Sequence, residues 1–351
     1  MVALVPALTA PVDPVTALRR IAFLMERQRA GSYRIEAFRK AAATISALPD
    51  GELAARHTAG TVQDLPGIGK ATAGVIGEAL DGELPAYLRS LQDNNTSLLK
   101  PGGEALYAAL AGDAHTHSNW SDGGSPIEEM VLTAVETGHE WMVLTDHSPQ
   151  LKVARGLTVE RLTKQIAIVD AITASLAGTF TLLKGIEVDI LDDGSLDQTP
   201  AMLAKLDLVV ASVHSKLRMN AEPMTRRMVA AVRNPRVNIL GHCTGRLVTG
   251  SRGTRSQSDF DARAVFEACA EHDVAVEINS RPERCDPPDE LILLAQEIGC
   301  LFSIDSDAHA PGQLDMKAYG AERATRLGID PDRIVTTWDV DRLREWAGRR
   351  A

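Results

Sequence analysis

Residues 113–123 have the sequence DAHTHSNWSDG, which places two histidines two positions apart at the end of a strand predicted at 112–116. Side chains at positions i and i+2 of a strand lie on the same face, so His115 and His117 can bind one common group. Asp122 follows in the next loop. The stretch therefore predicts a strand whose C-terminal end carries metal-binding side chains.

The same arrangement recurs along the rest of the chain. Further strands are predicted at 141–145, 180–188, 207–213, 236–241, 274–278 and 300–305, and amphipathic helices fit between most of them. This alternation predicts an α/β fold with a β/α barrel, in which functional groups gather at the carboxyl ends of the strands. The polar residues at these strand ends include His147, Glu187, His214, His242, Asp307 and His309.

A structural role is the more common explanation for any single histidine beside an apolar run. Six of the nine histidines at strand ends are hard to explain in that way. The other three, His57, His139 and His272, lie in helical or linking segments and receive no predicted role. Mixed imidazole and carboxylate ligands without thiolate are typical of Mn²⁺, Zn²⁺ or Fe²⁺ sites, so the pattern predicts a metal centre.

Composition suggests about two domains and excludes a membrane-spanning protein. The chain has 351 residues, 44% of them hydrophobic and 24% charged, and no run approaches the ~20 apolar residues that cross a bilayer. The first ten residues do not resemble a signal peptide and the four cysteines lack CxxC spacing, so we expect a cytoplasmic protein with reduced thiols. Residues 1–112 hold eleven basic and eleven acidic residues, which places the whole net charge of −10 in residues 113–351.

The first part of the chain predicts a small all-helical domain. A helix starts at Asp13-Pro14, and the sequence LPGIGK at 65–70 precedes another helix that ends near residue 80. Two short helices joined by such a Gly-x-Gly turn form a helix-hairpin-helix. Gly67 and Gly69 let backbone N–H groups approach a phosphate, and Lys70 adds a cation at the start of the next helix. The alternative is that the two glycines only close a tight helix–helix turn.

A resemblance favours the phosphate-binding interpretation. Residues from about 14 to 92, which include YRIEAFRKAA and LPGIGKATAGVIGEAL, resemble the small N-terminal DNA-binding domain of family X DNA polymerases. The resemblance implies that DNA is a partner and that Gly67, Gly69 and Lys70 contact its backbone. In the eukaryotic repair members a lysine in the helix after the hairpin forms a Schiff base with an abasic sugar. Val75 stands at the matching position here, so the resemblance does not extend to that lyase chemistry.

The rest of the chain resembles the polymerase and histidinol phosphatase (PHP) superfamily. The motifs within 113–351 are DAHTHSNWSDG, TDHS, ARGLTVERL, KGIEVDI, ASVHS, GHCTGR, EIN and SDAH. The likeness is strongest to the C-terminal PHP domain of bacterial family X polymerases, and it implies a distorted (β/α)7 barrel. Those enzymes hold a nucleotidyltransferase core between the two regions, where this chain has only residues 96–112, so DNA synthesis is not expected.

In that superfamily nine ligands hold three metal ions. The resemblance therefore implies three divalent ions (Mn, Zn or Fe), with Glu187 bridging two sites and with Glu187, Asp307 and His309 taking part in catalysis. The first ion would be held by His115, His117, Glu187 and Asp307, the second by Asp122, His147 and His309, and the third by Glu187, His214 and His242.

Other polar residues stand next to these motifs. Asp113, Asp146 and Asp189 neighbour predicted ligands, and they either orient imidazoles or cap the strand ends. Basic residues that follow the ligand motifs could hold the non-bridging oxygens of a phosphate ester, or could equally form surface ion pairs. The candidates for this substrate contact are Arg155, Lys216, Arg246, Arg281 and Arg284.

We therefore expect a helix-hairpin-helix domain at 1–95, a linker at 96–112 and a PHP domain at 113–351. The first functional hypothesis is a metal-dependent phosphoesterase acting on DNA, as a 3'-5' exonuclease or in the processing of 3' ends or abasic sites. The second is a small-molecule phosphomonoesterase of the histidinol phosphatase type. The third is a DNA-binding adaptor whose barrel has lost catalysis, which the complete ligand set argues against. The neutral N-terminal region argues for caution about DNA, because dedicated DNA modules are usually basic.

Overall fold

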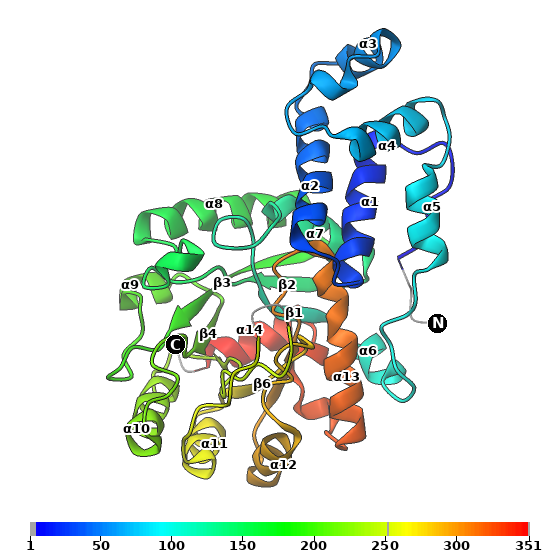
Figure 1. Cartoon of the computed structure of the whole chain (residues 1–351). Helices are drawn as coiled ribbons and strands as arrows, with labels where there is room; N and C mark the ends of the chain where they lie inside the picture. The colour runs from blue at the N-terminus through cyan, green and yellow to red at the C-terminus, as the bar shows by residue number, and fades with distance from the viewer. Residues whose placement is uncertain (1–4, 251–252, 350–351) are drawn as a thin grey trace. The chain divides into compact units, whose positions relative to one another are not determined.

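The computed structural model describes residues 5–250 and 253–349, and its contacts divide the chain into two compact units (Figure 1). The helical unit holds the described residues up to Ser97 together with Ala310–Gln313, and the barrel unit holds Leu98–His309 and the residues from Leu314 onward. The segment predicted as a linker, 96–112, contains the short helix α6 (Glu104–Ala109), which lies in the barrel unit. The exact domain boundaries stay a prediction.

The helical unit is a set of short helices around one apolar core. The α1 helix begins as its sequence indicates, because the Asp13 side chain accepts a hydrogen bond from the Thr16 amide at 2.9 Å and Pro14 occupies the first helical position. The buried side of α1, which includes Leu18 and Ile21, packs against α2 and α4. The elements are α1 (Pro14–Arg27), α2 (Ser32–Ser46), α3 (Glu52–Ala59), the 3-10 turn η1 (Val62–Asp64), α4 (Lys70–Leu80) and α5 (Ala86–Asp93).

The barrel unit is built on seven parallel strands that pair in chain order, from β1 to β7. A parallel bridge between Thr116 and Ala308 joins the end of β1 to the segment after β7, so the sheet is a nearly closed barrel. The predicted (β/α)7 architecture is confirmed. The strands are β1 (Gly112–Thr116), β2 (Trp141–Leu144), β3 (Thr181–Asp189), β4 (Leu208–Ser212), β5 (Ile239–Leu240), β6 (Ala275–Asn279) and β7 (Phe302–Asp305).

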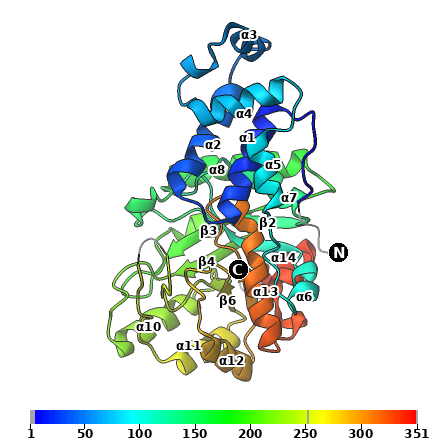
Figure 2. The same cartoon turned by 45° about the vertical axis from the view of Figure 1, so that its right-hand side comes forward.

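Helices surround these strands, as the views in Figures 1 and 2 show. The neighbouring helices α10, α11 and α12 pack side by side on the outside. The barrel strands are buried almost throughout, because one face of each strand points into the barrel interior and the outer helices cover the other face. The helical elements are α7 (Ile127–Glu136), η2 (Lys152–Ala154), α8 (Val159–Ser175), α9 (Pro200–Leu203), α10 (Ala221–Val232), α11 (Ala262–Glu271), α12 (Asp289–Ile298), η3 (Pro311–Met316), α13 (Lys317–Arg326), η4 (Pro331–Arg333), η5 (Val335–Thr337) and α14 (Val340–Gly348).

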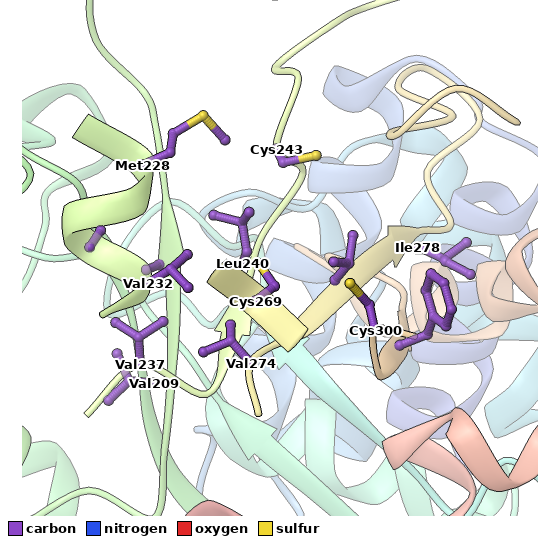
Figure 3. Close-up of a cluster of buried hydrophobic side chains, with 14 of the residues drawn as sticks. Val209, Met228, Val232, Val237, Leu240, Cys243, Cys269, Val274, Ile278 and Cys300 are labelled. Carbon is purple, nitrogen blue, oxygen red and sulfur yellow. The ribbon is translucent and has the colours of Figure 1, made fainter. Parts of the chain in front are cut away.

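The layer between strands and outer helices is mainly aliphatic, with phenylalanine side chains and buried thiols (Figure 3). Cys269 and Cys300 lie there among side chains such as Val274 and Ile278, and none of the four cysteines forms a disulfide with another described residue. Burial raises the pKa of Cys300 to about 12, so this thiol stays protonated and acts as a small apolar side chain. None of the described helices is long and apolar enough to cross a bilayer.

Candidate metal centre

The nine predicted ligands meet at the C-terminal ends of the barrel strands. β1 and the loop after it provide His115, His117 and Asp122, and β3 provides Glu187. The other five follow β2, β4, β5 and β7, and they are His147, His214, His242, Asp307 and His309. The possible ligand atoms form four groups, within each of which all atoms lie within 4.8 Å of one another: His117, Asp122, His147 and His309; His115, His117 and Asp307; His115, Glu187 and His242; and His147, Glu187 and His214.

Glu187 lies at the centre of this cluster, and its side chain is 1% exposed. Each of its two carboxylate oxygens faces more than one imidazole, which is the arrangement that a bridging ligand requires. Oε2 lies 2.9 Å from Nδ1 of His147, 3.3 Å from Nε2 of His115 and 3.5 Å from Nε2 of His117, while Oε1 lies 2.8 Å from Nε2 of His242 and 3.2 Å from Nε2 of His214.

Asp122 lies on the opposite, more open side of the cluster. Its Oδ1 atom is 3.4 Å from Nε2 of both His147 and His309. The Asp122 side chain is 37% exposed and that of His309 is 20% exposed, whereas His117 is fully buried. The cluster is therefore more accessible to solvent at Asp122 and His309 than at His117.

The buried atoms of the cluster fit metal ions. Both carboxylate oxygens of Glu187 and the Nε2 atoms of His115, His117 and His214 are buried, and none of these described atoms has a hydrogen-bond partner. Leaving buried polar atoms unpaired costs about 1–3 kcal/mol each, and native proteins rarely do so. Divalent cations would satisfy these lone pairs, and imidazole with carboxylate is the donor set that Mn²⁺, Zn²⁺ and Fe²⁺ accept. The residue-by-residue assignment to three ions stays a prediction.

Electrostatics keep the central carboxylate ionised. Burial raises the pKa of Glu187, but the charges of His115 and His214 outweigh that effect and hold the pKa well below its usual range. Burial lowers the pKa of His214, but Glu187 and Asp189 raise it to about 9. Burial, together with His309 and His147, holds the pKa of His117 well below its usual range, so this imidazole is neutral and its lone pair is available.

Glu277 supports the cluster and received no role in the sequence analysis. Its Oε1 lies 2.6 Å from Nδ1 of His115, and its Oε2 accepts a hydrogen bond from the His242 amide. Asn279, two positions further along β6 and on the same face, donates to Oδ2 of Asp307 at 3.1 Å. Both residues belong to the EIN motif, and their alternation at a strand end was the signal that could have revealed them.

The three aspartates beside the ligands have three different roles, two of which the sequence analysis had left open. Asp189 lies 3.2 Å from Nδ1 of His214 and therefore orients an imidazole. Asp146 accepts hydrogen bonds from the backbone and hydroxyl of Ser118, at 2.8 and 2.6 Å, and shapes the loop after β1. Asp113 accepts from the amides of His115 and Ser306, which is the role of a strand-end cap.

The five predicted substrate-binding cations fall in different places. Arg281 and Arg284 lie at the cluster, where Nη1 of Arg281 is 3.2 Å from Nδ1 of His309 and Nε of Arg284 is 3.1 Å from Oδ2 of Asp307. The other three have protein partners. Arg155 donates to backbone carbonyls of the Asp122 loop, Lys216 forms an exposed ion pair with Asp192, and Arg246 donates to the carbonyls of Arg284 and Cys285.

Comparison with known proteins agrees with this geometry. Residues 113–281 match the family model of the PHP domain, and residues 12–83 match that of a helix-hairpin-helix domain. The match to the PHP domain lies within the barrel unit. The predictions of a PHP fold and of a phosphoester hydrolase of the PHP type are thereby confirmed.

The relatives that resemble this chain differ in size. The chain is 39% identical over 217 residues to the DNA polymerase/3'-5' exonuclease PolX of Bacillus subtilis, which covers 62% of this chain but only 37% of that protein. It is 28% identical over 249 residues to a probable phosphatase of Thermoanaerobacter sp., which covers 67% of this chain and 93% of that protein. A crystal structure of a putative histidinol phosphatase from Listeria monocytogenes matches 58% of this chain and 97% of its own, with 19% identity and a TM-score of 0.46.

The helix-hairpin-helix turn contains the glycines that the sequence singled out. Gly67 has a φ of +78°, a conformation that favours glycine, and Gly69 precedes α4 as its N-cap residue. The Gly69 amide donates to Oγ1 of Thr72 at 3.0 Å, so this N–H has a partner within the turn, and its contact with DNA stays a prediction. The amides in the first turn of α4, which include those of Lys70 and Ala71, have no carbonyl acceptor within the helix and remain as donors.

Proposed function

We propose that this protein is a metal-dependent phosphoesterase that hydrolyses phosphate esters of DNA, at 3' ends or at abasic sites. The observation that carries the proposal is the buried cluster around Glu187, in a chain that also contains a helix-hairpin-helix domain. An ion-binding cluster supplies hydrolytic chemistry, and a separate phosphate-binding turn favours a polymeric substrate. Tethering the two raises the effective concentration of a bound DNA end near the barrel without any new contact.

The nine clustered residues would hold the metal ions, with Glu187 shared between sites. Divalent ions held there would lower the pKa of bound water towards neutrality and stabilise negative charge on phosphoryl oxygens. The protein's own groups position the ester, because the guanidinium groups of Arg281 and Arg284 lie beside Asp307 and can hold non-bridging oxygens. The buried side of the cluster excludes bulk water, and Asp122 marks the side on which the ester enters.

The α4 helix supports DNA binding in this proposal. Its first amides point out of the helix start, where the helix dipole favours a phosphate group. Lys70 stands at the first position of α4. Lys40 is near the same turn, because a Cβ atom built at Gly67 would lie 3.9 Å from Cβ of Lys40. Together these groups can hold a DNA phosphate even though the region around them carries no net charge.

A substrate panel tests the proposed function. The full chain is stripped with a chelator, reloaded separately with Mn²⁺, Zn²⁺ and Fe²⁺, and assayed on recessed 3' ends, abasic duplex, histidinol phosphate and p-nitrophenyl phosphate. We expect hydrolysis of at least one DNA substrate with a kcat/KM that exceeds the value for p-nitrophenyl phosphate. We also expect two to three ions per chain by elemental analysis and no hydrolysis in the chelated protein. Hydrolysis of small esters alone would overturn the DNA proposal.

The alternative function is that of a small-molecule phosphomonoesterase. One comparison favours it, because the alignment covers 93% of the Thermoanaerobacter probable phosphatase and only 67% of this chain. The matched residues thus make up nearly the whole of that relative, but only about two thirds of this chain. Under this alternative the helical unit would be a scaffold, and histidinol phosphate or a nucleotide would be the best substrate in the panel.

A further inference from the structure

A cleft of about 600 Å³ lies in the barrel unit at the same end as the metal-ligand cluster. Three neighbouring loops line it: the loop after β4, the loop after β5 and the loop after β6. Because the carboxyl ends of parallel strands all meet at one end of a barrel, the cleft shares that end with the cluster. Its volume falls within the ~300–1,000 Å³ range of sites that hold small organic ligands.

The lining is strongly basic for an acidic protein. Among the described residues that line the cleft, four are arginines and one, Glu283, is a carboxylate. The sequence analysis named two of these arginines as phosphate contacts, and it assigned nothing to the other two. The four are Arg218, Arg255, Arg281 and Arg284.

Two of these arginines connect the cleft to the metal-ligand cluster. Arg281 and Arg284 both contact Asp307, at 3.8 Å from Oδ1 and 3.1 Å from Oδ2 respectively, and their side chains are 15% and 17% exposed. Arg218 is exposed and lies in the loop that begins after His214. The basic lining therefore runs from the cluster outwards rather than forming an isolated surface patch.

The walls of the cleft are held in place by hydrogen bonds. In the loop after β5, the backbone amides of Leu247 and Arg255 each donate to the other's carbonyl at 2.9 Å. Nε of Arg255 also donates to the Gly245 carbonyl at 2.7 Å. The same loop is joined to the loop after β6 by a 2.7 Å bond from the Val248 amide to the Glu283 carbonyl. Buried Asp286 adds a further link, because it accepts hydrogen bonds from Thr244. Binding to such preformed walls costs little conformational entropy.

We propose that this cleft binds a second phosphate of the nucleic-acid strand, next to the ester that is hydrolysed at the metal centre. This inference rests on the proposed function and deepens it, because it makes the substrate an oligonucleotide with at least two backbone phosphates. A phosphomonoester has only one phosphate, which would lie at the metal centre, so it has no second phosphate to contact Arg218 and Arg255. Guanidinium groups match phosphate oxygens in pairs, so the cleft selects a phosphodiester strand by charge and geometry and reads no base.

The test compares thymidine dinucleotide d(TpT), with one phosphate, and trinucleotide d(TpTpT), with two. For the full, metal-loaded chain we expect kcat/KM for the trinucleotide to exceed that for the dinucleotide about 10- to 100-fold, the range that a charge-assisted phosphate contact supplies. We expect Arg218→Ala to remove most of that ratio and Arg218→Lys to retain part of it. Arg226→Ala is the matched control, because Arg226 is an exposed arginine on α10 paired with Glu222 away from the cleft, and it should leave the ratio unchanged.

A binding measurement complements the kinetics. For a labelled trinucleotide, the logarithm of the association constant decreases with the logarithm of the salt concentration. Replacing Arg218 by Ala should make this negative slope about 0.7 less steep, as expected for the loss of one contact to a single strand. If the chain hydrolyses both oligonucleotides and Arg218→Ala changes neither the ratio nor the slope, the cleft inference is wrong and the proposed function stands. If the chain hydrolyses recessed 3' ends or abasic duplex but neither oligonucleotide, the cleft inference is wrong and the proposed function stands. If it hydrolyses p-nitrophenyl phosphate and no DNA substrate of the panel, both are wrong.

Discussion

Nδ1 of His115 lies 2.6 Å from Oε1 of Glu277, and both side chains are fully buried beneath the metal-ligand cluster. Nδ1 donates its proton to this carboxylate, so when a metal ion replaces the proton on Nε2, the Nε2 lone pair is the one available to bind it. The carboxylate thus selects the tautomer that a metal ligand needs and increases the basicity of the ring. Glu277 is a positioning residue, because it acts on the metal site only through the groups that it holds.

The first prediction is that Glu277→Gln lowers metal affinity about tenfold and Glu277→Ala up to about 100-fold, the range seen when such supporting groups are removed. Glutamine can still accept the Nδ1 hydrogen bond but has lost the charge, whereas alanine leaves the imidazole without a partner. Competition with a calibrated chelator measures the affinity. Glu267→Gln on the exposed face of α11 is the control, and equal affinities for wild type and both Glu277 variants would contradict the prediction.

The second prediction concerns the two carboxylates that differ most in burial. Glu187 contacts five imidazoles and is 1% exposed, while Asp122 contacts two and is 37% exposed. Glu187→Gln should therefore lower the metal content, measured by elemental analysis after dialysis, by at least one ion per chain. Asp122→Asn should remove one ion at most. Circular dichroism must first show that both variants are folded, because metal binding and folding can be coupled. Equal and mild losses would show that the bridging role of Glu187 is wrong.

The third prediction is a pH dependence of metal binding. Burial lowers the pKa of His214, but Glu187 and Asp189 raise it to about 9, so this imidazole is protonated in the metal-free protein at pH 7. A metal ion must displace that proton. Apparent affinity should therefore rise with pH up to about pH 9, by about tenfold per unit for each proton that the metal ion displaces. Calorimetry in buffers of different ionisation enthalpy should detect proton release at pH 7. An affinity that is independent of pH from 6.5 to 9 would contradict the prediction.

The sequence predicted the barrel and the position of the cluster because both depend on local patterns. Strand limits follow from short apolar runs, and a residue at a strand end is brought to the same mouth whatever lies between the strands. The fifth strand shows the limit of that reasoning. It was predicted at 236–241, and the structure pairs only Ile239–Leu240, because pairing depends on the neighbouring strands β4 and β6 and not on apolar character alone.

Contacts between distant segments could not be predicted in the same way. Glu277 acts on a histidine 162 positions earlier in the chain, and no local spacing records that pair. Arg155 and Arg246 follow the ligand motifs just as Arg281 does, yet their guanidinium groups donate to backbone carbonyls of nearby loops. Arg218 was overlooked for the opposite reason. It stands beyond the ligand motif, and only the folding of three loops brings it into the same cleft as Arg281.

The last prediction tests the hairpin without removing it. Gly69 has a φ of −95°, and a Cβ atom built there meets nothing within 4 Å, so Gly69→Val should fold normally. The branched side chain would stand beside the first amides of α4 and keep a DNA phosphate away from them. We expect the affinity for duplex DNA, measured by fluorescence anisotropy, to fall about 10-fold or more, as for the loss of a charge-assisted hydrogen bond.

Gly31→Val is the matched control, because Gly31 is also an N-cap glycine, at the start of α2, with a negative φ and open space around its Cβ position. Hydrolysis of p-nitrophenyl phosphate should be the same in both variants, since the barrel carries that chemistry. If Gly69→Val binds DNA as tightly as Gly31→Val and wild type at every salt concentration, the hairpin is only a helix–helix turn and the small-molecule phosphatase becomes the better description of the protein.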